Sequence, residues 1–421
     1  MSEKRFKKIS VVGLGYIGLP TAAMFASRKI EVVGVDINQR TVDTINRGEI
    51  HIIEPDLDMI VQAAVKDGYL RATTEVESAE AFLIAVPTPF KGENHEPDLT
   101  YIHAATLAIA PVLEPGNLVI LESTAPVGAT EQMTDWLAGA RPDLSFPYSK
   151  EAESDIRIAH CPERVLPGKV MQELITNDRV IGGMTPACSG IAANLYKVFV
   201  TGECVIASGP RVAEMAKLTE NSYRDVNIAF ANELSIISDK LGLDVWELIK
   251  LANRHPRVEI LQPGPGVGGH CIAVDPWFIV SSAQKEAKLI RTARTVNDSK
   301  PHWVLAKVLE AIHGFLEQKP TILETDIEVS IYGLTFKPDI DDLRESPALY
   351  IAEKLASLVE CRFKIIEPNI TELPNRLHDM KLVSLDEGIV SDIHLLLVDH
   401  SEFKAGPIPD GLVVDCRGVW K

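Results

Sequence analysis

The segment from residue 8 to residue 36 constrains the fold more than any other part of the chain. A short β-branched run, Lys8–Val12, leads directly into Gly13-Leu-Gly-Tyr-Ile-Gly18; helix-compatible residues follow, and the next β-branched run is closed by Asp36. This order of strand, glycine turn, helix, strand and acid is the fingerprint of a dinucleotide-binding βαβ unit. We therefore expect a Rossmann-like domain in this part of the chain.

Each glycine of such a turn has its own task. The first permits the tight turn, the second lets a pyrophosphate approach the helix N-terminus, and the third lets helix and strand pack closely. Asp36 would accept hydrogen bonds from the adenosine ribose and repel a 2′-phosphate, which favours NAD over NADP; the alternative is an ordinary residue at a strand end. The cofactor-binding residues predicted here are Gly13, Gly15, Tyr16, Ile17, Gly18 and Asp36.

Alternation of strands and helices continues along the chain and predicts an α/β fold with two Rossmann-like parallel-sheet domains. The expected strands are Lys8–Val12, Glu31–Val35, Ala81–Val86, Leu118–Glu122 and Ile156–His160, and later Val329–Gly333, Arg362–Ile366, Ile393–Val398 and Leu412–Asp415. Between them, Arg211–Leu241 lacks glycine and proline and predicts a long helix that joins the domains. A second helical block is expected at Gln284–Leu316, followed by a polar connection. We expect domains over residues 1–205, 206–316 and 317–421.

Composition narrows the class of protein. The 421 residues are 46% hydrophobic, enough for several real cores, and the net charge of −17 argues against nucleic acid or an anionic membrane as partner. No apolar stretch reaches the roughly twenty residues of a membrane span. The six cysteines are scattered without Cys-x-x-Cys spacing, so we expect neither a metal site nor a disulfide framework. A soluble, cytoplasmic enzyme fits best.

A cysteine at the end of a glycine-dense loop indicates covalent chemistry. Cys271 follows Pro263–Gly269, which holds four glycines and two prolines, and Asp275 lies four residues further on. Glycines let a backbone approach a ligand closely, and a thiol can capture an aldehyde and pass it on as a thioester. The alternative is a buried structural cysteine. Together with the nucleotide fingerprint, the loop predicts a dehydrogenase that forms a covalent bond to its substrate.

Three further loops carry polar candidates after predicted strands. Thr88 and Thr124 lie in turns at the carboxyl ends of two strands, where open parallel sheets bind ligands, although plain turns would use the same residues. Glu163 and Arg164 follow a third strand. The carboxylate could position or activate a water and the guanidinium could meet a phosphate, unless the two form a surface pair.

A stripe on the long helix is a further candidate. Lys217, Asn221 and Arg224 recur at helical spacing and share one face. A solvated face is the default for such a stripe, but the apolar flanks suggest burial, where an unpaired lysine is costly. Other basic residues, at Arg254–Arg257 and around Lys337 and Arg344, would give the local positive field that a diphosphate needs.

Taken together, these residues resemble the UDP-glucose/GDP-mannose dehydrogenase family of nucleotide-sugar 6-dehydrogenases. The resemblance covers nearly the whole chain, through Gly13–Pro20, Cys161–Arg164, the Lys217 helix, Gly268–Cys271, Phe336–Lys337 and Val414–Arg417. Within the family, Asn253–Val258, Ile84–Lys91 and the loop ending at Trp277 are most similar to the branch that acts on acetamido sugars. UDP-glucose dehydrogenases usually carry Ser where this chain has His270.

The resemblance implies two successive NAD-dependent oxidations at C6 of a UDP-N-acetylhexosamine, for bacterial surface polysaccharide of the enterobacterial common antigen type. It implies that Cys271 is the nucleophile, that Lys217 is a general acid/base, that Asn221 and Asp275 assist with the oxyanion and the water, and that Glu163 lies near the thioester. The implied UDP-sugar residues are Arg164, Val165, Lys217, Asn221, Arg224, His255, Arg257, Gly268, Phe336, Lys337 and Arg417, and Arg344 would reach the cofactor. The family's long helix also implies a homodimer.

Other functions stay open at this point. A hydroxyacid dehydrogenase would use the fingerprint and Lys217 but leave Cys271 and the second domain without a task. A non-catalytic NAD-binding regulator would need neither residue. The sugar epimer is not fixed by residue types, so UDP-N-acetylglucosamine and UDP-glucose remain alternative substrates.

Overall fold

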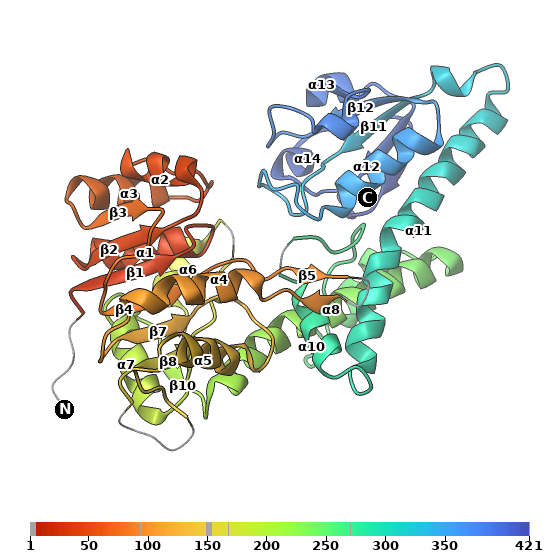
Figure 1. The fold of residues 1–421 in the computed structure, drawn as a ribbon. Coiled ribbons are helices and arrows are strands. Elements are labelled where there is room, and N and C mark those ends of the chain that lie inside the picture. The colour runs from red at the N-terminus through yellow and green to blue at the C-terminus, as the bar shows by residue number, and fades with distance from the viewer. Residues whose placement is uncertain (1–5, 93–94, 149–153, 167, 270, 421) are drawn as a thin grey trace. The chain divides into compact units, whose positions relative to one another are not determined.

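The protein is described by a computed structural model that covers residues 6–92, 95–148, 154–166, 168–269 and 271–420. The chain forms two compact units: the first comprises residues 1–220 and 277–282, and the second comprises residues 221–276 and 283–421 (Figure 1). Each unit contains a largely or wholly parallel sheet with helices on both faces. The predicted α/β class with two Rossmann-like sheets is therefore confirmed.

The first unit is built on an eight-stranded sheet in the order β10-β9-β8-β7-β4-β1-β2-β3. Its strands are β1 Lys8–Val12, β2 Glu31–Val35, β3 Leu70–Thr73, β4 Ala81–Ile84, β7 Leu118–Leu121, β8 Arg157–His160, β9 Arg179–Gly183 and β10 Cys204–Ile206. All neighbours pair in parallel except β8 and β9, which are antiparallel. The sheet thus departs from the predicted parallel arrangement only at its β9–β10 edge.

Helices cover both faces of this sheet, because every central strand is apolar on both sides. Ile9 and Val11 of β1 pack into one core with α1, α3 and α7, whereas Val12 packs into another with α4 and α5. The helices are α1 Gly18–Ser27, α2 Gln39–Asn46, α3 Leu57–Lys66, α4 Thr100–Ile109, α5 Ala129–Ala140, α6 Val170–Thr176 and α7 Pro186–Tyr196; β5 Phe90–Lys91 and β6 Glu96–Pro97 form a small hairpin.

The register of the sheet determines where its loops meet. Val12 pairs with both Val35 and Ile84, Ile84 pairs with Leu121, and Leu121 pairs with His160. The carboxyl ends of five parallel strands therefore lie at one edge. The loops with the glycine turn, Asp36, Thr88, Thr124 and Glu163 all leave the sheet at this edge, where open α/β sheets bind ligands.

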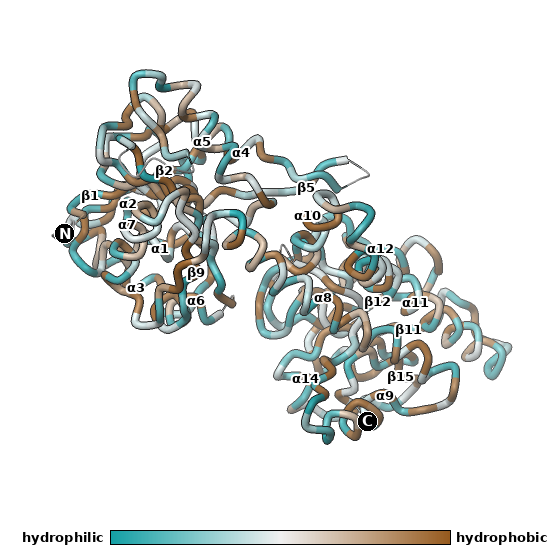
Figure 2. The backbone as a smooth tube through the Cα atoms, turned by 90° about the horizontal axis from the view of Figure 1, so that it is seen from below, coloured by the Kyte–Doolittle hydropathy of each residue, from teal (hydrophilic) through white to brown (hydrophobic). Residues whose placement is uncertain are grey.

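The second unit is built on a five-stranded parallel sheet in the order β13-β12-β11-β14-β15. Its strands are β11 Glu328–Tyr332, β12 Arg362–Ile366, β13 Lys381–Leu382, β14 Ile393–Leu396 and β15 Leu412–Asp415. Helices α11 (Lys288–Gln318) and α12 (Pro347–Leu358) pack on one face, and Phe403 of α14 (Ser401–Ala405) packs on the other beside α13 (Leu385–Gly388). In Figure 2 the tube is brown along buried strands and teal along surface loops.

The remaining helices are α8 Pro210–Leu241, α9 Val245–Ala252 and α10 Asp275–Ser282. The long helix predicted at Arg211–Leu241 is confirmed as α8. The second predicted block starts four residues later and ends two residues later than expected, as α11, which continues through Pro301. Among the described residues, no helix is both long enough and apolar enough to cross a membrane.

Candidate active site

The glycine turn of the first unit is a cradle that side chains would close. Gly13 has a φ of +93°, and a Cβ atom there would lie 2.5 Å from the carbonyl oxygen of Ala85. A Cβ on Gly18 would lie 1.8 Å from the carbonyl oxygen of Gly13, whereas a Cβ on Gly15 would meet no atom within 4 Å. The first and third glycines are thus required by packing, and the second leaves open space over the N-terminus of α1, as a pyrophosphate requires.

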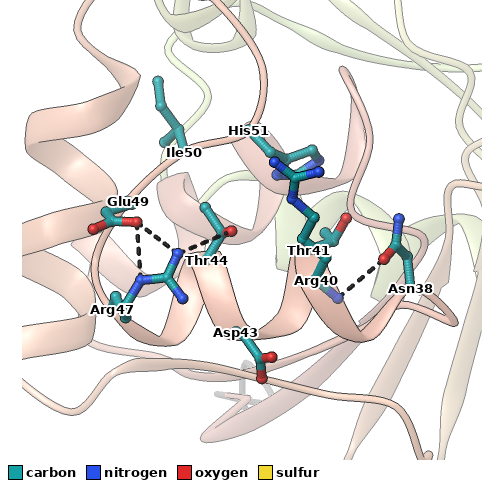
Figure 3. A pocket seen from close by; sticks show the side chains of 9 residues that line it. All are labelled: Asn38, Arg40, Thr41, Asp43, Thr44, Arg47, Glu49, Ile50 and His51. Atoms are coloured by element: carbon teal, nitrogen blue, oxygen red, sulfur yellow. Dashed lines mark hydrogen bonds and ion pairs between the residues drawn. The ribbon is translucent and has the colours of Figure 1, made fainter.

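Asp36 is tied to this turn. Its Oδ2 accepts a hydrogen bond from the backbone N–H of Leu14 (3.0 Å) and its Oδ1 accepts one from Asn38 (2.9 Å). Two residues further on, a pocket of about 790 Å³ opens along α2, and the ion pair of Arg47 with Glu49 (2.8 Å) flanks it (Figure 3). The pocket is lined by Asn38, Arg40, Thr41, Asp43, Thr44, Arg47, Glu49, Ile50 and His51.

The loops after β4 and β7 are held together by a residue that the sequence analysis did not single out. Ser123 Oγ donates a hydrogen bond to the carbonyl oxygen of Val86 (2.7 Å). Thr88 follows Val86 by two residues, and its Oγ1 is buried with no hydrogen-bond partner among the described residues. An unpartnered buried hydroxyl at the ligand-binding edge fits a cofactor that supplies the missing partner. Thr124, the other predicted cofactor residue of these loops, is half-buried.

Two buried glutamates fix the ends of neighbouring loops. Glu214 of α8 accepts hydrogen bonds from the backbone N–H groups of Gly128 (2.6 Å) and Thr130 (2.8 Å) at the start of α5. Glu54 accepts hydrogen bonds from Gly168 (2.8 Å) and Val170 (2.7 Å) at the start of α6. Each carboxylate satisfies helix N–H groups that have no partner within the helix. Glu214 thus fixes the chain just after the loop that carries Thr124, and Glu54 fixes it just after the loop that carries Glu163.

Glu163 belongs to a buried charge cluster. Its Oε2 forms an ion pair of 2.5 Å with Arg179, which also lies 3.7 Å from Glu122, and Tyr196 donates a hydrogen bond to Glu122. Burial, opposed by Arg179 and reinforced by Glu163, raises the pKa of Glu122 to about 8. Burial likewise raises the pKa of the neighbouring Cys161 thiol to about 12. Burial therefore favours the neutral form of the Glu122 carboxyl, and Arg179 forms its shorter ion pair with Glu163.

The next two predicted residues of this loop differ in their surroundings. Arg164 forms an ion pair with Glu220 of α8 (2.5 Å), and its Nε donates a second hydrogen bond to the same carboxylate (3.0 Å). Arg164 therefore pairs with Glu220, and its contact with a phosphate stays a prediction. Val165 is half-buried and packs on the core of the first unit.

The predicted stripe on α8 is buried at two of its three positions. Lys217 and Asn221 are buried, and Arg224 is exposed. In the second unit, Asn221 Nδ2 donates a hydrogen bond of 2.5 Å to Asp275 Oδ2. The backbone N–H of Asp275 donates to the carbonyl oxygen of Cys271 (2.9 Å), so one turn of chain joins this pair to the exposed thiol. His270 lies outside the described residues.

The glycine loop before Cys271 packs on the second sheet's loops. A Cβ on Gly268 would lie 2.4 Å from the carbonyl oxygen of Glu345 and 2.9 Å from Phe336 Cβ, and Gly264 leaves room for the guanidinium of Arg417. Arg417 is also paired with Asp399 (2.6 Å). Three predicted substrate residues, Gly268, Phe336 and Arg417, thus meet around one loop.

The remaining predicted residues lie at the surface or close to it. Lys337 is half-buried beside Phe336, and Arg344 is exposed and paired with Asp342 (2.6 Å). His255 and Arg257 are exposed in the loop after α9. Its ends are joined because the side-chain amide of Asn253 donates to the carbonyl oxygen of Ile260 (2.9 Å) and accepts from its N–H (2.8 Å).

Comparison with known proteins supports this arrangement along the whole chain. The sequence matches the NAD binding domain of the UDP-glucose/GDP-mannose dehydrogenase family over residues 7–200, its central domain over 211–299 and its UDP binding domain over 330–421. It is 60% identical to UDP-N-acetyl-D-mannosamine dehydrogenase of Salmonella typhi over 421 residues, which cover 99% of this chain and 100% of that one. It is also 60% identical to NDP-N-acetyl-D-galactosaminuronic acid dehydrogenase of Ralstonia nicotianae over 419 residues, which cover 99% and 96%.

A solved structure agrees with these relatives. The UDP-D-ManNAc dehydrogenase of Pyrococcus horikoshii is 37% identical and superposes with a TM-score of 0.87 over 98% of this chain and 96% of that one. The family match identifies NAD as the cofactor, and the open space at the glycine turn fits a dinucleotide. The chain therefore belongs to the UDP-glucose/GDP-mannose dehydrogenase family and is an NAD-dependent nucleotide-sugar dehydrogenase.

Proposed function

We propose that this enzyme oxidises C6 of UDP-N-acetyl-D-mannosamine from alcohol to carboxylate, with Cys271 as a covalent nucleophile. The observation that carries the proposal is the exposed Cys271 thiol at the end of a glycine loop, one turn of chain before the buried pair of Asp275 with Asn221. The relatives named as UDP-N-acetyl-D-mannosamine dehydrogenases support the sugar. A UDP-N-acetylgalactosamine substrate is the second candidate, because a relative of equal identity is named for the galacto acid.

The chemistry follows from the two oxidation levels that the product requires. When bound, NAD accepts a hydride, so conversion of an alcohol to an acid consumes two NAD and one water. After the first hydride leaves C6, the Cys271 thiolate adds to the aldehyde carbon and forms a thiohemiacetal; loss of the second hydride leaves a thioester. Water then attacks the thioester carbonyl, and the thiolate departs as the acid forms.

Other residues of the chain are assigned to charge and proton transfer. Lys217 is the general acid/base that takes the alcohol proton and stabilises the oxyanions, with Asn221 as a second donor. Asp275 orients the hydrolytic water, and Glu163 lies near the thioester. The buried hydrogen bond of 2.5 Å between Asn221 and Asp275 supports their joint role.

The ligand-binding roles rest on charge and position. The UDP-sugar is held by Arg164, Val165, Lys217, Asn221, Arg224, His255, Arg257, Gly268, Phe336, Lys337 and Arg417, and the cofactor by the glycine turn, Asp36, Thr88, Thr124 and Arg344. Exposed cations at Arg224 and Arg257 supply local positive charge on a chain whose net charge is −17, and they attract the diphosphate. Arg164 serves the diphosphate if binding displaces Glu220 from its guanidinium.

We also infer a homodimer whose subunits meet along α8. In the second unit this helix exposes Tyr223, Phe230, Ile237 and Leu241, which recur at helical spacing on one side. An exposed stripe of large apolar side chains is typical of a surface that a partner covers, and a second copy offers the same stripe.

The product of the proposed reaction is a UDP-N-acetylhexosaminuronate. Such activated acidic sugars are building blocks for surface polysaccharide, of the enterobacterial common antigen type in this proposal, and the reaction is placed in the cytoplasm, where UDP-sugars and NAD occur together. The names of the relatives support nucleotide-sugar metabolism in general.

The test counts NADH for each of four substrates. Purified enzyme with limiting UDP-N-acetylmannosamine is expected to yield two NADH per sugar, with poor turnover of UDP-N-acetylglucosamine and hardly any of UDP-glucose; UDP-N-acetylgalactosamine is the fourth arm. Faster turnover of UDP-glucose would reject the sugar assignment. Cys271→Ser is expected to lose nearly all net turnover and to hold an ester adduct by intact mass spectrometry. Near-normal acid production by Cys271→Ala would reject the covalent mechanism.

A further inference from the structure

In the second unit, α8 and α11 contact each other through polar side chains. Asp225 and Asn232 of α8 and Arg294 and Asn297 of α11 are each at most 2% exposed. Asn232 follows Asp225 by seven residues, and Asn297 follows Arg294 by three. The two polar residues of each helix therefore lie on one face of that helix. Facing helices ordinarily bury apolar stripes there, and a buried ion pair costs more desolvation than apolar side chains of the same volume. This polar seam therefore calls for an explanation other than stability.

The first end of the seam reaches the residue after Cys271. Arg294 Nη1 donates a hydrogen bond of 2.7 Å to Asp225 Oδ1 and a long one of 3.4 Å to the carbonyl oxygen of Ile272, and its Nη2 pairs with Asp298. Asp225 Oδ2 and Arg294 Nε have no partner in the described parts of the chain. The guanidinium of Arg294 therefore does not form a bidentate ion pair with Asp225. Its Nη1 donates both to Asp225 and to the carbonyl oxygen of Ile272 in the loop.

The second end of the seam reaches the start of the same loop. Asn297 Nδ2 donates to Asp225 Oδ1 (2.8 Å), and Asn232 Nδ2 donates to Asn297 Oδ1 (2.8 Å). Asn232 Oδ1 in turn accepts a hydrogen bond of 2.9 Å from the backbone N–H of Gly264. One continuous, buried chain of side chains therefore joins the two ends of the loop Gly264–Ile272.

We propose that Arg294 and Asn232 are positioning residues for Cys271, because they hold both ends of its loop in one geometry. The loop needs such anchors, since its glycines allow many backbone conformations. A displacement of about 1 Å in a reacting group can cost on the order of a hundredfold in rate. The inference rests on the proposed role of Cys271 as nucleophile. It also accounts for a polar seam where apolar packing would be cheaper.

The first test replaces the ion pair by apolar side chains of similar volume, Asp225→Leu with Arg294→Met. Such exchanges are often neutral or stabilising for folding, so the thermal midpoint is expected to stay or rise. The amides of Gly264–Ile272 are expected to exchange hydrogen at least tenfold faster, and kcat is expected to fall at least tenfold with KM for UDP-N-acetylmannosamine within threefold. The control is Ser235→Ala with Lys300→Met, which removes a buried hydrogen bond of 2.6 Å between the same helices without touching the loop.

A second variant keeps the proposal testable if the first does not fold. Asn232→Ala removes the acceptor of the Gly264 N–H together with the donor to Asn297 Oδ1. It is expected to accelerate hydrogen exchange at the start of the loop and to lower kcat. Unchanged loop exchange, or faster exchange with wild-type kcat, in the folded variants would overturn the proposal. Hydrogen exchange of the loop amides is measured without substrate. It therefore tests whether the seam anchors the loop even if Cys271→Ala retains acid production and the covalent mechanism is rejected.

Discussion

Asp36 combines two tasks at the scale of a single residue. Its carboxylate holds the glycine turn through Leu14 and the start of α2 through Asn38, and we propose that it also binds the adenosine ribose. Because its charge repels a 2′-phosphate, kcat/KM with NAD is expected to exceed that with NADP by more than tenfold, or about 1.4 kcal/mol. Asp36→Asn, which removes the charge but keeps one acceptor oxygen in place of two, is expected to narrow this ratio. Equal efficiency of the wild-type enzyme with both cofactors would contradict the assignment.

Glu122 gives a pH prediction at the same scale. Burial raises its pKa from 4.5 to about 8, so between these values the folded chain keeps a proton that the unfolded chain has released. The stability that Glu122 contributes is therefore full below about pH 4.5 and is lost as pH rises towards 8. Between pH 5 and pH 8.5, the thermal midpoint of wild type is expected to fall by a few degrees more than that of Glu122→Gln. The exposed Glu75→Gln serves as the control; parallel curves for Glu122→Gln and wild type would refute this account.

At the scale of the element, the cysteine loop depends on the absence of side chains. A Cβ on Gly268 would lie 2.4 Å from a backbone oxygen, which cannot rotate away, so Gly268→Ala must shift the loop from Phe336. We expect a KM for the nucleotide sugar at least tenfold higher and a thermal midpoint several degrees lower. Gly314→Ala is the matched control, because nothing lies within 4 Å of its Cβ and alanine favours a helix over glycine. Wild-type kinetics for Gly268→Ala would show that the loop is not confined there.

The sequence predicted best those elements whose ends are marked by turn residues or by an acidic residue. The strands Lys8–Val12 and Glu31–Val35 were predicted to the residue, because a glycine turn and Asp36 close them. The strands β9 and β10 were missed: β10 is apolar but has only three residues, and two of them are exposed, so the run is too short to indicate a strand. The antiparallel pairing of β8 with β9 depends on the path of the connection between the two strands. The local hydrophobic periodicity of the sequence does not encode that path.

The same limit applies to the candidate site. Motifs close in sequence, such as the glycine turn and the cysteine loop, were visible, whereas the anchors were not. Glu54 meets Gly168 across 114 residues, and Arg294 meets Asp225 across 69. A faint signal was available, since Asp225, Asn232 and Arg294 are polar at helix positions where the apolar stripe would fall. Their partners become apparent only when the helices are packed.

At the scale of the whole molecule, the proposed dimer completes each active site with Arg257 of the second subunit. This arginine is exposed in the loop that Asn253 closes, so it is available to a neighbouring subunit. Cys271→Ala and Arg257→Ala homodimers are each expected to be nearly inactive. Mixed after reversible dissociation, the two chains form hybrid dimers in which one site carries both substitutions and the other carries neither, so up to about a quarter of wild-type activity should return.

Two controls make this prediction decisive. Native mass spectrometry measures the fraction of hybrid dimer, and a mixture of Cys271→Ala with Cys271→Ser must stay inactive because neither chain supplies the thiol. Phe230→Glu, which places a charge in the exposed stripe of α8, is expected to weaken the dimer and to lower activity at low protein concentration, with recovery as concentration rises. Confirmed hybrids without recovered activity would place Arg257 in the site of its own subunit, whereas an active Phe230→Glu monomer would remove the need for a shared site.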